Sequence, residues 1–220
     1  MIFITAVSAI IFSACKKDEV KLTPLASLNV TNAVVSGTTA KFGSRTTTIS
    51  NNNFTQFGLI AGSNSLYIYP STDSLHPYYN NSITTNKGEV YSLFLGGTPA
   101  AVDAVVVKET IPYRTDSTAG IRFINLAPNS AALNITLSTT PTVNEVSGLA
   151  YKSYTDFKTY AGLYNSTYTF QIRDASTAAP ANPLATFALS TSTVPRFANI
   201  TLVIRQNGTG VAVFRVNNDR

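Results

Sequence analysis

The sequence predicts an all-β protein that consists of two tandem antiparallel β-sandwich domains. Hydrophobic and polar side chains alternate with a period of two, as where Leu133, Ile135 and Leu137 alternate with Asn134 and Thr136. This alternation is typical of half-buried antiparallel strands. Turn signals rich in Asn and Gly separate such runs, and we find no helical periodicity after the N-terminal segment. A long internal repeat then predicts that one such domain occurs twice.

The composition favours strands and gives no indication of a nucleic-acid partner. Only 12% of the residues are charged, and Thr, Ser and Asn take many of the polar positions. Thr packs well on a pleated surface and less well in helices, because it is β-branched. The net charge of +5 comes from basic residues scattered along the chain, whereas nucleic-acid binders usually gather them on one face. We therefore expect no binding to nucleic acid.

The first 14 residues form an uncharged apolar segment that ends directly before the only cysteine, Cys15. This segment is too short to span a bilayer but has the length of the apolar region of a signal peptide. It resembles a bacterial lipobox, in which the cysteine is diacylated and becomes the mature N-terminus. Phe12 stands where Leu is usual, and no basic residue precedes the apolar run. We predict a lipoprotein signal peptide over residues 1–14 and lipidation at Cys15. The alternative is a buried N-terminal helix with an incidental cysteine.

Residues 15–24 are expected to form a short polar tether. Because Cys15 is the sole cysteine, no intramolecular disulfide can form, and stability has to come from burial and strand pairing. Several acyl chains hold a protein stably at a membrane, so the lipid at Cys15 would be the membrane anchor. We expect a lipid-anchored protein of the outer membrane, on its periplasmic or its cell-surface face. Asp18-Glu19 resembles an export signal for the surface, but Lys16-Lys17 makes that signal ambiguous.

The internal repeat is clearest in two nine-residue stretches, 54–62 and 154–162. Each contains an aromatic residue, Thr, a polar residue and a second aromatic residue, and each ends in Ala-Gly. The sequence therefore predicts β-sandwich domains at residues 25–110 and 119–220, each of a typical domain size, with a polar linker over 110–118.

The repeat also predicts which positions of the two domains are equivalent. Phe57 should correspond to Phe157, and Tyr67 should correspond to Tyr168. Tyr168 alternates with Thr residues, so its ring is expected to face the core with its hydroxyl at the rim. By correspondence, we expect Tyr67 and Tyr69 in the core of the first domain.

The second copy resembles the family called domain of unknown function 4397. Residues 121–131 read as an aliphatic-Arg strand that runs into an Ala-Pro-Asn turn, and residues 154–172 continue with an aromatic-rich segment, Ala-Gly and a Tyr-centred strand. The first copy has 34–37, Val-Val-Ser-Gly, in place of that turn and is more diverged. The resemblance implies immunoglobulin- or transthyretin-like sandwiches on exported, often lipid-anchored proteins of Bacteroidota-type bacteria. It implies no activity.

The residues with catalytic potential are few. His76 is the only histidine, and its proximity in sequence to Asp73 and Ser74 does not supply the geometry of a catalytic triad. A zinc site needs several His or Cys ligands. The acidic residues form no close pairs in sequence, although two of them could still converge in space as a glycosidase pair. We therefore expect no enzyme activity, no metal and no cofactor.

Candidate ligand contacts remain in one loop of the first domain, at His76, Tyr78 and Tyr79. For the two tyrosines, loop packing and an exposed contact surface are both open. The predicted function is that of a non-catalytic lipoprotein of the cell envelope that acts as a binding or structural module, with the membrane and a protein or glycan as its partners. The alternative is a glycan-binding accessory protein that uses these loop aromatics.

Overall fold

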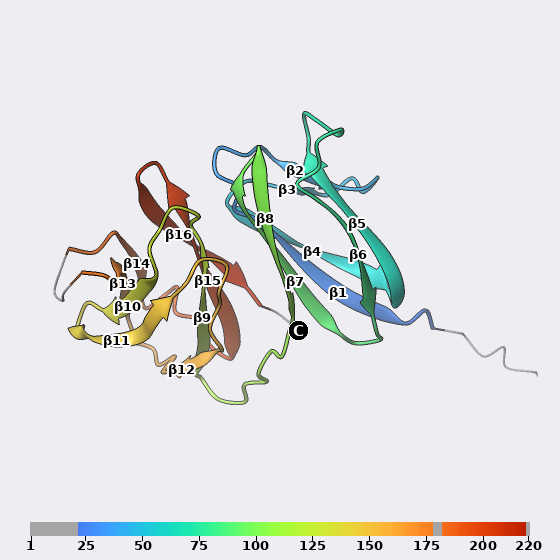
Figure 1. Ribbon diagram of the computed structural model, residues 1–220. Helices are drawn as coiled ribbons and strands as arrows, with labels where there is room; N and C mark the ends of the chain where they lie inside the picture. The colour runs from blue at the N-terminus through green and yellow to red at the C-terminus, as the bar shows by residue number, and fades with distance from the viewer. Residues whose placement is uncertain (1–21, 178–181, 219–220) are drawn as a thin grey trace, which may run out of the picture.

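The computed structural model describes residues 22–177 and 182–218, and within them it confirms the predicted all-β fold of two sandwiches (Figure 1). These residues form sixteen strands in four sheets of four strands each. The signal peptide and the lipidation site predicted at residues 1–14 and Cys15 lie outside the described residues. In the described part, no helix is long and apolar enough to cross a membrane.

The first sandwich spans residues 25–108. Its inner sheet, which faces the second sandwich, has the order β4-β1-β7-β8. These strands are β1 (Leu25–Asn32), β4 (Asn53–Ile60), β7 (Val90–Thr98) and β8 (Ala101–Lys108). The outer sheet has the order β3-β2-β5-β6, with β2 (Ala40–Phe42), β3 (Thr48–Ile49), β5 (Gly62–Pro70) and β6 (Tyr79–Thr85).

The second sandwich spans residues 119–217 and repeats this topology. Its inner sheet has the order β12-β9-β15-β16, with β9 (Ala119–Leu126), β12 (Lys158–Tyr160), β15 (Ala198–Asn207) and β16 (Gly210–Asn217). Its outer sheet has the order β11-β10-β13-β14, with β10 (Leu133–Leu137), β11 (Thr140–Leu149), β13 (Tyr168–Asp174) and β14 (Ala185–Leu189). The two sheet orders match strand for strand.

Two local features support the duplication at the level of single residues. Asn52 and Lys152 both have a positive φ, of 59° and 61°, and the backbone N–H of each donates to the carbonyl of an asparagine in the last two residues of the first strand of its domain. Those asparagines, Asn32 and Asn125, each accept a hydrogen bond on Oδ1 from the N–H two residues later. This side-chain turn replaces ladder hydrogen bonds where the strand ends.

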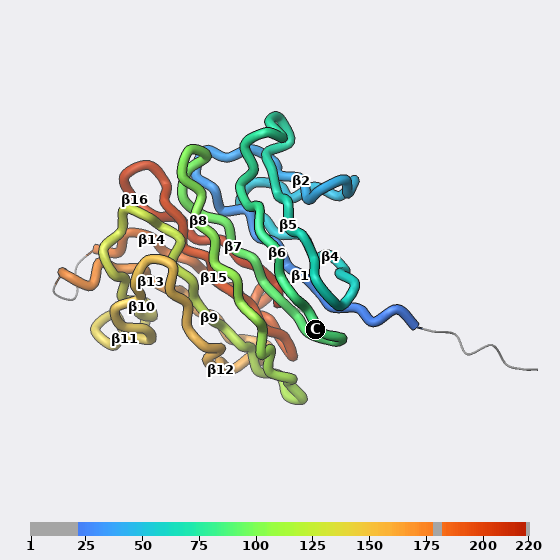
Figure 2. The backbone as a smooth tube through the Cα atoms, turned by 45° about the vertical axis from the view of Figure 1, so that its right-hand side comes forward, coloured from blue at the N-terminus to red at the C-terminus, as the bar shows by residue number. Residues whose placement is uncertain are grey.

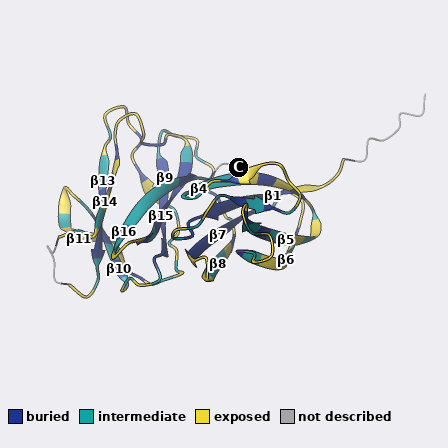
Figure 3. Ribbon diagram, turned by 90° about the horizontal axis from the view of Figure 1, so that it is seen from above, coloured by how far each residue is buried: buried dark blue, intermediate teal, exposed yellow. Residues whose placement is uncertain are grey.

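Each sandwich has its own apolar core between its two sheets. Leu28, Val30 and Leu93 are fully buried in the first core, and Ile121, Phe123 and Leu202 are at most 1% exposed in the second. The inward positions are those that the period-two pattern predicts. A third apolar cluster lies between the two inner sheets, and Figure 3 shows strands β7, β9 and β15 buried where the domains meet.

The predicted equivalence of Phe57 and Phe157 is wrong by one position. Phe57 lies opposite Leu28 on β1, whereas Lys158 lies opposite the corresponding Ile121 on β9. One extra residue in the second copy, between the Ile124–Tyr154 bridge and β12, shifts the register. Phe157 consequently packs on the guanidinium of Arg122, 4.5 Å from its ring centroid, instead of in the core.

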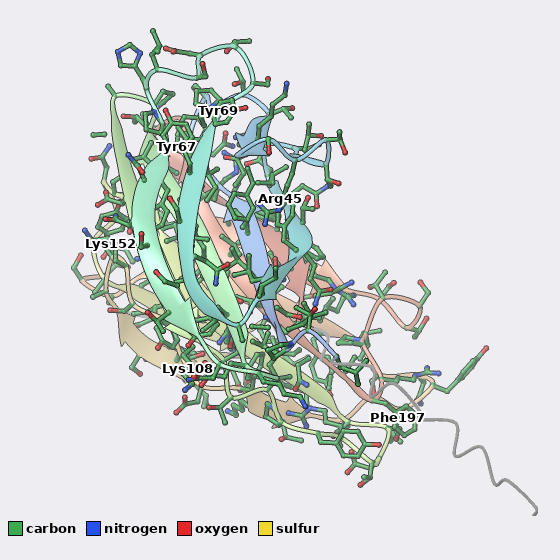
Figure 4. All side chains as sticks on the ribbon, turned by 90° about the vertical axis from the view of Figure 1, so that its right-hand side faces the viewer. Arg45, Tyr67, Tyr69, Lys108, Lys152 and Phe197 are labelled. Atoms are coloured by element: carbon green, nitrogen blue, oxygen red, sulfur yellow. The ribbon has the colours of Figure 1, made fainter. Side chains whose placement is uncertain are left out.

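The prediction that Tyr67 and Tyr69 belong to the core is also wrong. Ile68 on β5 lies opposite Phe42 on β2, and Ile172 on β13 lies opposite Ile135, the corresponding residue on β10, so Ile68 and Ile172 are equivalent. Tyr67 is therefore equivalent to Gln171, and Tyr168 is three positions away from it. An odd shift moves every side chain of a strand to the opposite face. Tyr168 faces inward, packed against the core as predicted, while Tyr67 and Tyr69 lie side by side on the outer face of β5 (Figure 4).

Candidate functional site

A third packed apolar cluster, outside the two cores, lies at the junction between the inner sheets. Its apolar centre consists of Ala33, Phe94 and Val107 from the first sandwich and Ile124, Leu126, Val203 and Val216 from the second. In Figure 2 the inner-sheet strands β7 and β8 run beside β9 and β15. Burial of these side chains stabilises the contact at roughly 25 cal/mol per Å² of apolar surface removed from water.

The two sandwiches use equivalent positions to form this junction. Phe94 lies opposite Thr31 in its sheet and Val203 lies opposite Ile124, so Phe94 and Val203 correspond. By the same comparison of registers, Val107 corresponds to Val216. A contact in which both partners present the same patch is the geometry of a two-fold dimer. The molecule is therefore arranged as a fused pseudo-dimer.

A buried ion pair lies at one side of the junction. Arg122 on β9 is 4% exposed at its side chain, and the side chain of Glu109, directly after β8, is fully buried. The Arg122 Nη1 donates to Glu109 Oε2 at 2.8 Å, Nη2 donates to Oε1, and Nε donates to Thr201 Oγ1 at 2.8 Å. Thr201 in turn donates to Asn218 Oδ1 at 2.6 Å. The bidentate geometry uses both carboxylate oxygens, so each charge is compensated locally.

A cleft of about 340 Å³ opens beside this ion pair. Its lining includes Tyr154, Asp156 and Phe157 in addition to the ion pair, and the Tyr154 ring is 45% exposed. Arg122 and Glu109 neutralise each other at the wall of this cleft. The pair connects the two domains, because Glu109 follows β8 of the first sandwich and Arg122 lies on β9 of the second.

A second polar contact fastens the junction at its opposite end. Asp103 on β8 accepts hydrogen bonds from the hydroxyl of Tyr151 at 2.5 Å and from the Nζ of Lys152 at 2.8 Å. The Lys152 contact is the first cause of the lowered pKa of Asp103, followed by the Tyr151 hydroxyl. Burial and then the hydrogen bond to Asp103 raise the pKa of Tyr151 above its ordinary value.

The residues predicted from the sequence as ligand contacts lie elsewhere, at the loop between β5 and β6. His76 is exposed, with Nδ1 2.7 Å from Asp73 Oδ2, and this hydrogen bond lowers the pKa of Asp73. Together with Leu75, Pro77 and the β7–β8 hairpin, His76 lines an open cleft of about 700 Å³. The only polar pair in this lining is His76–Asp73, and no hydroxyl nucleophile contacts the imidazole among the described residues.

The sequence left open whether the two tyrosines of this loop pack or form an exposed contact surface. Tyr78 is 6% exposed, and its hydroxyl accepts a hydrogen bond from the Thr38 N–H at 3.1 Å, so it packs. Tyr79 is the first residue of β6 and is half-buried against the first core, where burial raises its pKa. An exposed stacking pair of Tyr78 and Tyr79 is therefore not formed.

Sequence reasoning missed the ion pair at the junction. A signal was present, because Arg122 is the only charged residue of a mostly apolar strand, Ala119–Leu126. A charge on a strand that is buried throughout requires a partner. Its partner Glu109 comes from the other domain, and no sequence pattern indicates that pairing. Within the described residues, no group of three or more His, Cys, Asp or Glu side chains could hold a metal ion.

Comparisons with known proteins add little to this description. No family model matches the chain, and no curated protein matches it. Among solved structures, the chain is similar to the Bacillus anthracis TIE protein at 13% identity, with a TM-score of 0.25. That match covers 88% of this chain but 44% of the other, so the chain spans less than half the length of that structure. The resemblance to the family of unknown function stays a prediction.

Proposed function

We propose that the protein is a non-catalytic lipoprotein of the cell envelope, anchored in the outer membrane through Cys15, whose two fused sandwiches act as one rigid binding or structural module. The observation that supports a rigid module is the junction between the inner sheets. It combines an apolar centre with polar contacts at both ends, Glu109–Arg122 and Asp103–Lys152. Flexibly linked domains usually share more polar, less extensive contacts.

The sequence supplies the support for the anchor. An uncharged apolar run of 14 residues precedes Cys15, and only six residues separate Cys15 from Leu22, where the described structure begins. Such a short connection keeps the first sandwich close to the bilayer. The support for a non-catalytic role is that the Glu109–Arg122 ion pair is buried and locally compensated, while His76 pairs with an exposed carboxylate in a loop.

The anchor is tested by mass spectrometry of the mature N-terminal peptide from native membranes. We expect a peptide that begins at Cys15 and carries acyl chains, and we expect Cys15→Ala to leave the protein unacylated and released from the membrane fraction. An unmodified thiol at Cys15, or a different mature N-terminus, contradicts the anchor. Protease treatment of intact cells distinguishes the cell-surface from the periplasmic face.

The second candidate function, glycan binding, is favoured by one observation, the open cleft of about 700 Å³ beside His76. With Tyr78 packed, the contact would have to come mostly from the exposed side chains of His76 and Leu75 and from two prolines, Pro77 and Pro99. Binding to a panel of envelope glycans, compared between the wild-type protein and His76→Ala, tests this candidate. Equal binding of the two proteins contradicts a glycan site in this cleft.

A further inference from the structure

One end of the molecule carries segments from both sandwiches, and we call it the tether end. It is the end at which β1 and β9 begin. In the first sandwich, Ala61 donates its N–H to Pro24 O and Gly88 to Leu25 O, each at 2.8 Å, so the β4–β5 and β6–β7 turns lie there. In the second, Phe197 donates to Thr118 O at 3.1 Å, which places the β14–β15 loop beside the linker at the same end. This linker forms the lowest loop in Figure 1.

The end of the first sandwich at which β1 begins and the end of the second at which β9 begins lie at the same end of the molecule. Glu109, at the end of β8, meets Arg122 near the start of β9, while Asp103, near the start of β8, meets Lys152 beyond the end of β9. The strands β1 and β9 therefore run in the same general direction. Figure 4 shows Lys108 and Phe197 toward the lower end of the molecule, and Tyr67 and Tyr69 toward the upper end.

Exposed hydrophobic side chains concentrate at the tether end. Seven of the twelve large hydrophobic side chains that are exposed among the described residues lie there, and their exposed fractions run from 56% to 86%. They are Leu22, Leu25 and Ile60 in the first sandwich, Tyr113 in the linker, and Leu163, Tyr164 and Phe197 in the second sandwich. The other five are spread over strands β8 and β11 and three separate loops. A concentration of this kind marks an interaction surface.

Comparison of the two copies shows that the second sandwich has gained residues at this end. Its β12–β13 loop has seven residues, 161–167, where the first sandwich has only Ala61 between β4 and β5. Its β14–β15 loop has eight residues, 190–197, where the first has four, 86–89. Four of the seven exposed hydrophobic side chains lie in these two loops and the linker. The additions therefore enlarge the apolar surface of this end.

These segments are packed tightly against one another. A Cβ on Gly162 would lie 3.0 Å from the carbonyl carbon of Ser117 and 3.1 Å from Pro195 O, so the linker and the two loops meet where only glycine fits. Phe197 has a φ of 53°, a backbone conformation that is unfavourable for a residue other than glycine, and it is 59% exposed. A rigid backbone thus holds aromatic side chains out in the solvent.

Basic groups accompany the exposed aromatic rings. Arg196 is exposed, with its guanidinium carbon 5.7 Å from the Tyr164 ring centroid, and it lines a shallow cavity with that ring. Lys87 is exposed in the β6–β7 turn of the first sandwich, and one acidic residue, Asp116, is exposed in the linker, where it binds Thr118. Aromatic rings beside basic side chains suit the interface of a bilayer, where rings enter the headgroup region and cations meet lipid phosphates.

We propose that the tether end is a membrane-docking face that rests on the phospholipid surface in which the Cys15 lipid is inserted. The inference rests on the proposed lipid anchor. The chain from Cys15 reaches the tether end at Leu22 after six intervening residues, a span of at most about 25 Å at roughly 3.5 Å per residue. That short reach brings this end, and not the His76 loop at the opposite end, to the bilayer. Docking fixes the orientation of the rigid module and points the His76 cleft away from the membrane.

The absence of tryptophan from the sequence allows a direct test, because a single introduced Trp reports its own surroundings. The full acylated protein, carrying Tyr164→Trp or Leu25→Trp, is reconstituted into phosphatidylethanolamine–phosphatidylglycerol vesicles with brominated acyl chains. The matched control is Leu75→Trp, which is 83% exposed at the opposite end. We expect brominated lipid to reduce the emission of Tyr164→Trp and Leu25→Trp at least about twofold, and to leave Leu75→Trp unchanged. All three positions are exposed, so the fold tolerates the substitutions.

The outcomes separate the docking face from the anchor. Acylated Cys15 with equal emission from Tyr164→Trp and Leu75→Trp overturns the docking face and leaves the proposed function standing. Unacylated Cys15 overturns the anchor, and quenching of Tyr164→Trp in protein mixed with the vesicles then still decides the docking face. If a soluble glycan changes the Tyr164→Trp emission and the vesicles do not, these side chains bind a sugar, and the proposal of a membrane-docking face is wrong.

Discussion

The two sandwiches meet through the same face, but the polar residues beside that contact have diverged. Arg122 in the second sandwich and Asn29 in the first occupy corresponding positions, each directly after the Ile121 or Leu28 of its first strand. Each of the three guanidinium nitrogens of Arg122 donates one side-chain hydrogen bond. Asn29 donates from Nδ2 to the Asn217 carbonyl at 3.2 Å, but its Oδ1 and the Oγ of the neighbouring Ser92 are buried without a hydrogen-bond partner.

The difference shows what fusion of two copies permits. In a true two-fold dimer, any side chain placed at one side of the contact also appears at the other. Once the copies are joined in one chain, the two sides can differ. Arg122 pairs with Glu109 at one side of the contact, while the uncharged Asn29 occupies the corresponding position at the other. The apolar centre kept its pseudo-symmetry because both copies still bury it, and the polar positions became asymmetric.

The largest expected effect comes from Arg122→Ala. The change leaves the Glu109 carboxylate buried without a partner, and we expect a loss of about 3–5 kcal/mol in the free energy of unfolding, measured by urea titration. The matched control is Asn29→Ala, which removes one hydrogen bond and should cost about 1 kcal/mol. Replacing both charges together, as Arg122→Met with Glu109→Leu, should recover most of the loss. Equal costs for Arg122→Ala and Asn29→Ala contradict the asymmetry.

The second prediction concerns a side chain whose environment the sequence left open. Tyr78→Ala removes a buried ring and should cost about 3 kcal/mol, whereas Tyr78→Phe keeps the ring, leaves the Thr38 N–H without its acceptor, and should cost about 1 kcal/mol. In the second sandwich, the half-buried Tyr168→Ala should cost less than Tyr78→Ala. Thermal unfolding of the three variants checks the order. A Tyr78→Ala variant with unchanged stability contradicts the packed position.

The fold class followed from the sequence because period-two alternation and turn residues are local properties. The duplication also followed, since the stretches 54–62 and 154–162 still resemble each other in sequence. The register between the two copies did not follow from the sequence. One inserted residue before β12 and further residues in loop 161–167 shift it, but they do not change the alternation of polar and apolar residues within each strand. Tyr67 was therefore assigned to the wrong face. The Glu109–Arg122 pair depends on two domains that pack together, which is a tertiary property that neither local sequence contains.

The third prediction uses the Ala-Gly pair that the two copies share. Gly62 has a φ of 127° and open space around its Cα, whereas Gly162 lies against Ser117 and Pro195 with no room for a Cβ. We expect Gly162→Ala to cost about 2–3 kcal/mol through overpacking, and Gly62→Ala about 1–2 kcal/mol through backbone strain. Gly58→Ala, at a negative φ with open space, is the control and should be close to neutral. Similar costs at Gly58 and Gly162 contradict the close approach of the three segments.

The smallest expected effect is a pH dependence that arises from one carboxylate of the first sandwich, Glu89. Glu89 directly precedes β7, and the corresponding residue in the second sandwich is Ala198, the first residue of β15. The hydrogen bond from Lys108 is the first cause that lowers the pKa of Glu89 from its ordinary 4.5 to about 2, followed by the Asn86 backbone and side chain and the Tyr91 hydroxyl.

Because the pKa of Glu89 is lower in the folded protein than in the unfolded chain, its contribution to stability is fully present above pH 4.5 and is lost as the pH falls from 4.5 toward 2. NMR titration of the Glu89 carboxyl should show this low pKa in the wild-type protein and a value closer to 4.5 in Lys108→Met. Glu89→Gln should remove this part of the acid sensitivity, so that the wild-type protein loses more stability than the variant between pH 4.5 and 2. The effect should be modest, because the partner Lys108 is exposed to solvent and salt screens the pair. If wild-type protein and Glu89→Gln lose stability in parallel over that range, the Glu89–Lys108 pair does not distinguish the first sandwich from the second.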